Sequence, residues 1–187
     1  MRLCRSLSLF LFAVFIGGCV AIPSSPGENA PGRDALAAFS LEGRFSLRYE
    51  DKNYSGRLSW RHAGANNEVL LSSPFGQGMA EITTSATGAR LTTNDGKGYA
   101  AANAEALTQQ VLGYPLPLER LTDWVRGRSA AAGTFEPDEF GRPLRLRHED
   151  WRIDYTYDSD NAQALPIRII AERASGLELR LRIDEWT

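Results

Sequence analysis

The sequence predicts a mainly β protein in which one long antiparallel sheet curls on itself or packs against a second layer. Three observations lead to this prediction. From about residue 40 onwards, apolar and polar residues alternate with a period of two, the pattern of strands with one buried and one solvated face. Short turn sequences separate these segments, which favours an antiparallel meander. About ten to eleven strands are more than a flat sheet usually holds, so the sheet must curve or be covered.

The N-terminal half of the body begins with two well-marked strands. In residues 41–50 (LEGRFSLRYE), apolar or small residues occupy the odd positions and polar residues the even ones. Residues 54–61 (YSGRLSWR) alternate in the same way, and Asp-Lys-Asn between the two segments suits a tight hairpin. Further strands are expected at 67–72, at 79–85, at 88–93 and near Tyr99, the last of them after an Asn-Asp-Gly turn.

The C-terminal third repeats the alternation. In residues 151–157 (WRIDYTY) the large apolar residues again stand at odd positions, and residues 177–183 (LELRLRI) alternate most regularly. Residues 144–148 and 167–172 complete the set, although Ile170 interrupts the period of the second segment. The predicted sheet therefore has one apolar and one charged face.

Two short helices are expected between these groups of strands. In residues 104–112 the apolar residues recur at helical spacing, with Asn103 as a suitable N-cap and Gly113 as a suitable stop. Residues 117–126 begin with a proline, which suits a first helical turn, and place their apolar residues on one face. Spacing leaves two arrangements open. The helices could plug the open mouth of a curved sheet, or they could be core helices of a compact α+β fold.

The first twenty residues have the features of a bacterial lipoprotein precursor. Two arginines precede an apolar run of ten residues at 7–16. This run is far shorter than the roughly 20 residues that span a bilayer, but it suits a signal peptide. Ile-Gly-Gly-Cys at 16–19 then matches a lipobox. We expect residues 1–18 to be removed and Cys19 to be lipidated, which would anchor the protein to a membrane facing the periplasm. An ordinary secretory signal with an incidental cysteine is the alternative.

A flexible tether is expected after the lipidated residue. Residues 20–35 contain three Pro, two Gly and two Ser and show no apolar period. Such a segment reaches about 20–24 Å. Residue 20 is Val and not Asp, the residue that favours retention at the inner membrane in lipoprotein sorting, so the outer membrane is expected. Residues 19–35 then form the lipidated N-terminus and tether, and residues 36–187 form a single domain.

Composition and motifs argue against several classes of function. Cys4 lies in the segment to be removed and Cys19 would be acylated, so no thiol remains for a disulfide or a metal site. Loss of that segment changes the formal net charge from −2 to −4, which does not suggest nucleic acid as a partner. His62 and His148 lack ligand partners at suitable spacing, so we expect surface or hydrogen-bonded histidines. No catalytic or phosphate-binding motif occurs in the sequence, and we expect no enzyme, metal or cofactor.

A large aromatic residue stands in a loop sequence. Residues 73–78 (SPFGQG) join two predicted strands, and their Pro and Gly residues indicate a loop. Phe75 lies at its centre. Such a side chain either folds back onto the core or stays exposed to meet an apolar partner.

Several of these segments together resemble the LolB family, the outer-membrane receptors of the lipoprotein-localisation pathway. The most specific stretch is residues 112–118 (LGYPLPL), followed by Leu121, Trp124 and Gly127. The supporting segments are 43–45 (GRF), 73–76 (SPFG), 95–99 (DGKGY) and 184–186 (DEW). The resemblance covers most of the chain after the signal peptide.

The resemblance implies both a fold and a role. The fold would be an unclosed antiparallel β-barrel with the short helices as a lid over an apolar cavity. The role would be to accept lipoproteins from a soluble periplasmic carrier, LolA, and to release them into the inner leaflet of the outer membrane. The expected partners are this carrier, lipidated client proteins and outer-membrane lipid, and the chain is expected to be a monomer. The alternative is a structural lipoprotein with a closed core that helps to assemble an outer-membrane complex.

The resemblance also implies site residues. An exposed apolar residue at the tip of the 73–78 loop, Phe75 here, would aid delivery to the membrane. The acyl-chain cavity would be lined by inward strand positions and by the lid, and a closed core is the alternative for each of them. These positions are Phe45, Leu47, Leu58, Trp60, Leu118, Leu121, Trp124, Ile153, Tyr155, Ile169, Leu179 and Leu181.

Overall fold

The computed structural model describes residues 33, 35–128 and 133–187. The chain divides into two units, Met1–Ala30 and Pro31–Thr187, and the described residues all belong to the second. The predicted signal peptide, Cys19 and most of the predicted tether lie outside the described residues. Within the described part, no helix is long and apolar enough to cross a membrane.

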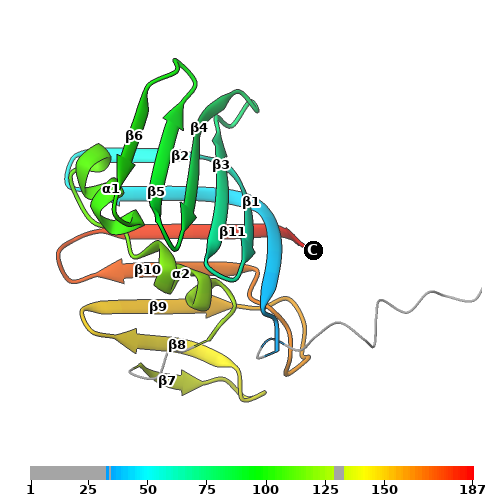
Figure 1. The fold of residues 1–187 in the computed structure, drawn as a ribbon. Helices are drawn as coiled ribbons and strands as arrows, with labels where there is room; N and C mark the ends of the chain where they lie inside the picture. The colour runs from blue at the N-terminus through cyan, green and yellow to red at the C-terminus, as the bar shows by residue number, and fades with distance from the viewer. Residues whose placement is uncertain (1–32, 34, 129–132) are drawn as a thin grey trace, which may run out of the picture. The chain divides into compact units, whose positions relative to one another are not determined.

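Eleven strands of the described residues form one antiparallel sheet (Figure 1). In chain order they are β1 (Ala38–Tyr49), β2 (Lys52–Ala63), β3 (Asn66–Ser72), β4 (Gly78–Ser85), β5 (Gly88–Thr93), β6 (Gly98–Ala101), β7 (Thr134–Pro137), β8 (Pro143–His148), β9 (Trp151–Thr156), β10 (Arg168–Arg173) and β11 (Glu178–Trp186). Their order in the sheet is β6-β5-β4-β3-β2-β1-β11-β10-β9-β8-β7, so β6 and β7 are free edges and the sheet does not close. This confirms the prediction of a mainly β protein with an unclosed antiparallel sheet.

The edge strand β7 is the one that alternation did not predict. Its four residues are all exposed, so they show no apolar face from which a period could be inferred. The other edge, β6, is also four residues long. Short edges offer few unpaired backbone groups to other chains, which limits edge-to-edge association.

The first and last strands join the two halves of the sheet at its centre. β1 pairs with β11, which places Phe45 opposite Leu181. A bulge interrupts this pairing between Glu42 and Gly43. A β-carbon at Gly43 would collide with the carbonyl oxygen of Arg182, so glycine is what allows the two backbones to approach here. All other strand pairs join neighbours in the sequence, and this long-range pair therefore unites β2–β6 with β7–β10.

The sheet is strongly twisted. In Figure 1, strands β3 to β6 run steeply across the direction of β8 to β10, and β1 bends between the two directions. A right-handed twist accumulates over many strands and gives the sheet a concave inner face. The helices occupy that face.

Two helices lie among the described residues, α1 (Ala104–Leu112) and α2 (Leu118–Val125) (Figure 1). Asn103 caps α1, since its side chain accepts a hydrogen bond from the amide of Ala106 at 2.8 Å. Gly113 ends the helix with a left-handed φ of 92°. Both predicted ends of this helix are therefore confirmed.

The two helices pack on different parts of the sheet. α1 places Leu107 against Leu91 of β5 in a small cluster. α2 contributes Leu121 and Trp124 to the main core. The Trp124 ring lies 5.3 Å from that of Trp151 at the start of β9. α2 therefore acts as a core helix towards its C-terminal end, while its first turns face the space described next.

Candidate functional site

An apolar cavity with a volume of about 310 Å³ lies between the inner face of the sheet and the two helices. Its lining comes from β1–β5 and β11, from both helices and from the segment that joins them: Phe45, Leu47, Tyr54, Leu58, Trp60, Val69, Leu71, Met79, Ala80, Ile82, Leu91, Thr93, Thr108, Val111, Leu112, Leu116, Leu118, Leu121, Leu179 and Leu181. The hydroxyl of Thr108 is already used, because it donates to the carbonyl of Ala104 and accepts from the amide of Leu116. Such a lining suits hydrocarbon and offers few groups to a polar ligand.

Most of the predicted cavity residues lie in this lining. They are Phe45, Leu47, Leu58, Trp60, Leu118, Leu121, Leu179 and Leu181. The strand residues among them belong to three adjacent strands, β2, β1 and β11, and the helix residues come from the first turn and the middle of α2. Curvature of the sheet brings the two sets to the same space.

The remaining four predicted residues do not line the cavity. Trp124, Ile153, Tyr155 and Ile169 are 0–5% exposed and belong to the packed core instead. The three strand residues among them face inwards, as the period of two requires, but they pack in the main core together with Trp124 of α2. Alternation identifies the inner face and not the position along it, so it could not separate these three strand residues from the residues that line the cavity.

Other lining residues were not predicted. Val69, Leu71, Ile82 and Leu91 occupy inward positions of β3, β4 and β5. The same period of two could have identified them, because the strands themselves were predicted. Leu116 lies between the helices, where no period applies.

A buried polar network marks one end of the cavity. The indole nitrogen of Trp60 donates to Oδ1 of Asn67 at 3.0 Å, and Nδ1 of His62 lies 2.9 Å from the same oxygen. Since an amide oxygen only accepts, Nδ1 of His62 carries the proton. Nδ2 of Asn67 donates to the hydroxyl of Thr84 at 2.9 Å. Burial lowers the pKa of His62 below its ordinary value, although the bond to Asn67 opposes this effect. The prediction of a hydrogen-bonded histidine is confirmed for this residue.

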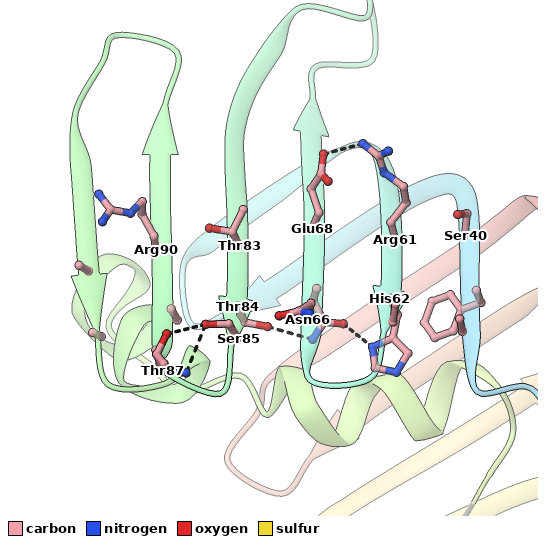
Figure 2. A pocket seen from close by; sticks show the side chains of 18 of the residues that line it. Ser40, Arg61, His62, Asn66, Glu68, Thr83, Thr84, Ser85, Thr87 and Arg90 are labelled. Carbon is pink, nitrogen blue, oxygen red and sulfur yellow. Dashed lines mark hydrogen bonds and ion pairs between the residues drawn. The ribbon is translucent and has the colours of Figure 1, made fainter.

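A second, larger pocket with a volume of about 890 Å³ lies beyond this network, around the same ends of β1–β6. Figure 2 shows its polar lining, including Arg61 of β2 and Glu68 of β3, which form an ion pair of 2.7 Å. Thr83 and Arg90 also line it. Its charged and hydroxyl groups make it unsuitable for acyl chains. Among the described residues, no group of His, Cys, Asp or Glu side chains could hold a metal ion.

The loop between β3 and β4 presents Phe75 to solvent. Its side chain is 95% exposed. The loop is held by its own backbone, because the amide of Ser73 donates to the carbonyl of Gln77 at 2.8 Å and the amide of Gly76 donates to that of Ser73 at 2.9 Å. Met79, which follows the loop, lines the cavity and is 38% exposed. The exposed aromatic residue is therefore four residues before a partly exposed residue of the cavity lining.

Known proteins are similar to this chain over nearly its whole length. The family model described as outer membrane lipoprotein LolB matches residues 37–186. The outer-membrane lipoprotein LolB of Dechloromonas aromatica is 40% identical over 184 residues, which cover 96% of this chain and 95% of the relative. That of Azoarcus sp. is 40% identical over 168 residues, covering 89% and 86%. A solved LolA superfamily protein from Nitrosomonas europaea is 13% identical, covers 81% of this chain and 86% of its own, and has a TM-score of 0.47.

The family match includes all eleven strands of the described residues, both helices and the loop that carries Phe75. The sequence identity to two relatives of that name reaches 40% over most of both chains. The chain belongs to the LolB family of outer-membrane lipoproteins of the lipoprotein-localisation pathway.

Proposed function

We propose that this protein accepts lipoproteins from a periplasmic carrier of the LolA kind, holds their acyl chains in the apolar cavity and inserts them into the inner leaflet of the outer membrane. The observation that carries this proposal is the cavity itself. Its lining is almost wholly aliphatic and aromatic, and it lies under two helices in a member of the LolB family.

The chemistry of the cargo explains why a cavity is needed. Each CH₂ group removed from water contributes about 0.8 kcal/mol, and a lipoprotein with three acyl chains has tens of such groups. Free diffusion through the periplasm is therefore strongly unfavourable. A cavity that shields part of this surface lowers the barrier, and a difference of about 1.4 kcal/mol between two such cavities shifts the distribution tenfold. Transfer can then proceed without an energy source.

We infer from the size of the cavity that the helical lid moves when cargo binds. A volume of about 310 Å³ is at the lower end of the roughly 300–1,000 Å³ typical of ligand pockets. It can hold part of one lipoprotein's acyl chains and not all of them. Leu118 and Leu121 of α2 line the cavity from the helix side, so a shift of α2 away from β1 and β2 would enlarge it.

Phe75 would act at the last step. A fully exposed aromatic ring gains about 1.5–3 kcal/mol when it is buried in an apolar phase. Partitioning of this ring into the bilayer would bring Met79, a partly exposed residue of the cavity lining, towards the membrane surface. The predicted anchor at Cys19 would keep the body close enough for repeated contacts.

Transfer from the carrier tests the proposed function. The lipidated protein is mixed with carrier loaded with a lipoprotein, and the distribution of that lipoprotein between the two is measured. The proposal expects the cargo to move to this protein without nucleotide. Retention of the cargo by a fully loaded carrier would contradict it and would favour a structural outer-membrane role.

A further inference from the structure

Four arginines stand side by side across four adjacent strands on the outer face of the sheet. Arg44 of β1 lies directly opposite Arg57 of β2 on one side and opposite Arg182 of β11 on the other. Arg182 in turn lies opposite Arg168 of β10. All four are exposed. This arginine row crosses three strand spacings, or about 14 Å.

Among the described strand pairs, the arginine row is the longest run of directly opposed like charges. Other arginines are directly opposed to acids, as in Arg61 with Glu68 and Arg145 with Asp154. These two pairs form ion pairs with N–O distances of 2.7 and 2.5 Å. Arg147 and Arg152 also face each other, but that run spans only two strands. Like charges placed directly opposite each other destabilise a sheet, so the row does not serve stability. A feature that costs stability in four consecutive strands indicates a binding role.

The row is only partly neutralised. Among the described residues, Asp184 is the carboxylate within ion-pair distance of it, 2.7 Å from Nη2 of Arg44 and 3.6 Å from Nε of Arg182. The bulge in the β1–β11 pairing places this aspartate beside the row. Arg57 and Arg168 form no ion pair with any described residue. The row therefore keeps a net positive charge, with unpaired guanidinium groups at both of its ends.

One end of the row adjoins the loop that carries Phe75. On its other side Arg57 lies opposite Ser72, the last residue of β3, and the loop starts at the next residue. An exposed aromatic residue thus lies three residues along the chain from the strand position opposite one end of the row. That combination matches a bilayer surface, where phosphate groups lie directly above hydrocarbon. Guanidinium groups bind phosphate oxygens in a fork-like geometry.

We propose that the arginine row binds the headgroup phosphates of anionic phospholipids in the membrane that Phe75 enters. The inference rests on the proposed membrane-delivery function and adds the lipid class and the contact surface. Phe75 would supply the apolar contact, and the row would set the orientation of the body and the preference for anionic lipid. Each basic residue near an anionic surface strengthens binding about fivefold.

Vesicle binding of charge variants tests this proposal. The chain from residue 19 with Cys19→Ser is used, so that a lipid anchor does not mask the weaker contact. Sedimentation compares vesicles of phosphatidylcholine alone with vesicles that also contain phosphatidylglycerol. The test variant carries Arg57→Gln and Arg168→Gln, the two unpaired members of the row. The matched control carries Arg61→Gln and Arg90→Gln, which remove the same charge from the outer face around the second pocket (Figure 2).

The proposal expects the row variant to lose about twentyfold in affinity for the anionic vesicles and the control variant to lose less than about threefold. Binding of the parent should fall steeply with added salt. Equal losses in both variants, or none in the row variant, would overturn the proposal. So would a row variant that binds anionic vesicles normally but no longer takes cargo from the carrier, because the row would then face a protein. The proposed function is tested separately. It fails if no cargo moves from the carrier, or if Phe75→Glu binds vesicles of phosphatidylcholine alone as well as the parent does.

Discussion

The indole nitrogen of Trp60 donates a hydrogen bond to the side-chain oxygen of Asn67 across 3.0 Å, at the point where the apolar cavity ends. Trp60 and Val69 line the cavity, whereas His62 and Asn67, one inward position further along the same strands, line the polar pocket beyond it. A single step along β2 and β3 therefore changes the inner face from apolar to polar. The network of Asn67 separates the two spaces, and this boundary can be tested.

Replacement of Asn67 should destabilise the fold. Asn67→Ala leaves the buried Trp60 N–H and the His62 N–H without their acceptor, and an unsatisfied buried donor costs about 1–3 kcal/mol. We expect the free energy of unfolding in urea to fall by about 2–4 kcal/mol. Asn66→Ala, at the exposed neighbouring position, is the control and should change it by less than about 0.5 kcal/mol. Equal effects at both positions would contradict a structural role for the network.

Stability should depend on pH through His62. Burial lowers the pKa of the folded histidine, so the unfolded chain binds a proton that the folded chain does not. The contribution of neutral His62 is therefore complete above the unfolded pKa of about 6.5 and is lost as the pH falls below it. Asp123 of α2 favours the charged form, and Arg126, which follows the last residue of α2, opposes it. His62→Gln keeps a donor for Asn67 without this titration.

Urea unfolding at pH 7 and at pH 5 measures the effect. The parent should lose more stability between these values than His62→Gln does. A parent and variant with the same change would show that His62 does not titrate differently in the folded state. The acidic residues whose pKa values are lowered, such as Asp184 beside Arg44, titrate below this range.

Truncation to alanine should change stability strongly at Trp124 and hardly at all at Phe75. Trp124 is fully buried, so Trp124→Ala should cost about 3–5 kcal/mol of stability. Phe75 is 95% exposed, so Phe75→Ala should change stability by less than about 0.5 kcal/mol. A large loss of stability at Phe75 would place the ring in the core and remove the basis of its proposed role.

A charge at Phe75 should affect delivery and not acceptance of cargo. Phe75→Glu should reduce binding to phosphatidylcholine vesicles about tenfold to a hundredfold, since burial of the ring is lost. Transfer of a lipoprotein from the carrier should persist. Phe135→Glu is the control, because Phe135 is also exposed, at 52%, but lies on the edge strand β7. Equal losses in the two variants would contradict a specific role of the loop.

Much of this fold follows from local patterns in the sequence. The period of two and one turn signal identified ten of the strands, and Asn103 and Gly113 fixed the ends of α1 because capping depends on a few adjacent residues. The pairing of β1 with β11 joins distant segments, and no local pattern specifies it. Strand β7 was not predicted, because its four exposed residues show no apolar face.

The cavity residues could be predicted only in part, because strand alternation does not show which inward residues are covered by α2. Phe45 and Ile153 stand in equally regular alternating strands, yet only the first faces the cavity. The difference depends on where α2 rests on the curved sheet, which is a matter of tertiary packing. Exposure of Phe75 also depends on how the 73–77 backbone closes on itself, and residue type alone left both orientations open.

Binding of an acyl chain in the cavity is the claim on which the rest depends. The most direct measurement is a titration with a fluorescent fatty-acid analogue, using the chain from residue 19 with Cys19→Ser so that its own acyl groups do not compete. Leu71→Trp adds volume to the cavity lining, and Leu70→Trp adds the same volume at a neighbouring position that is 42% exposed. We predict saturable binding that Leu71→Trp reduces at least about tenfold and Leu70→Trp leaves unchanged. Absence of saturable binding, or equal binding by both variants, would contradict the cavity as the acyl-chain site.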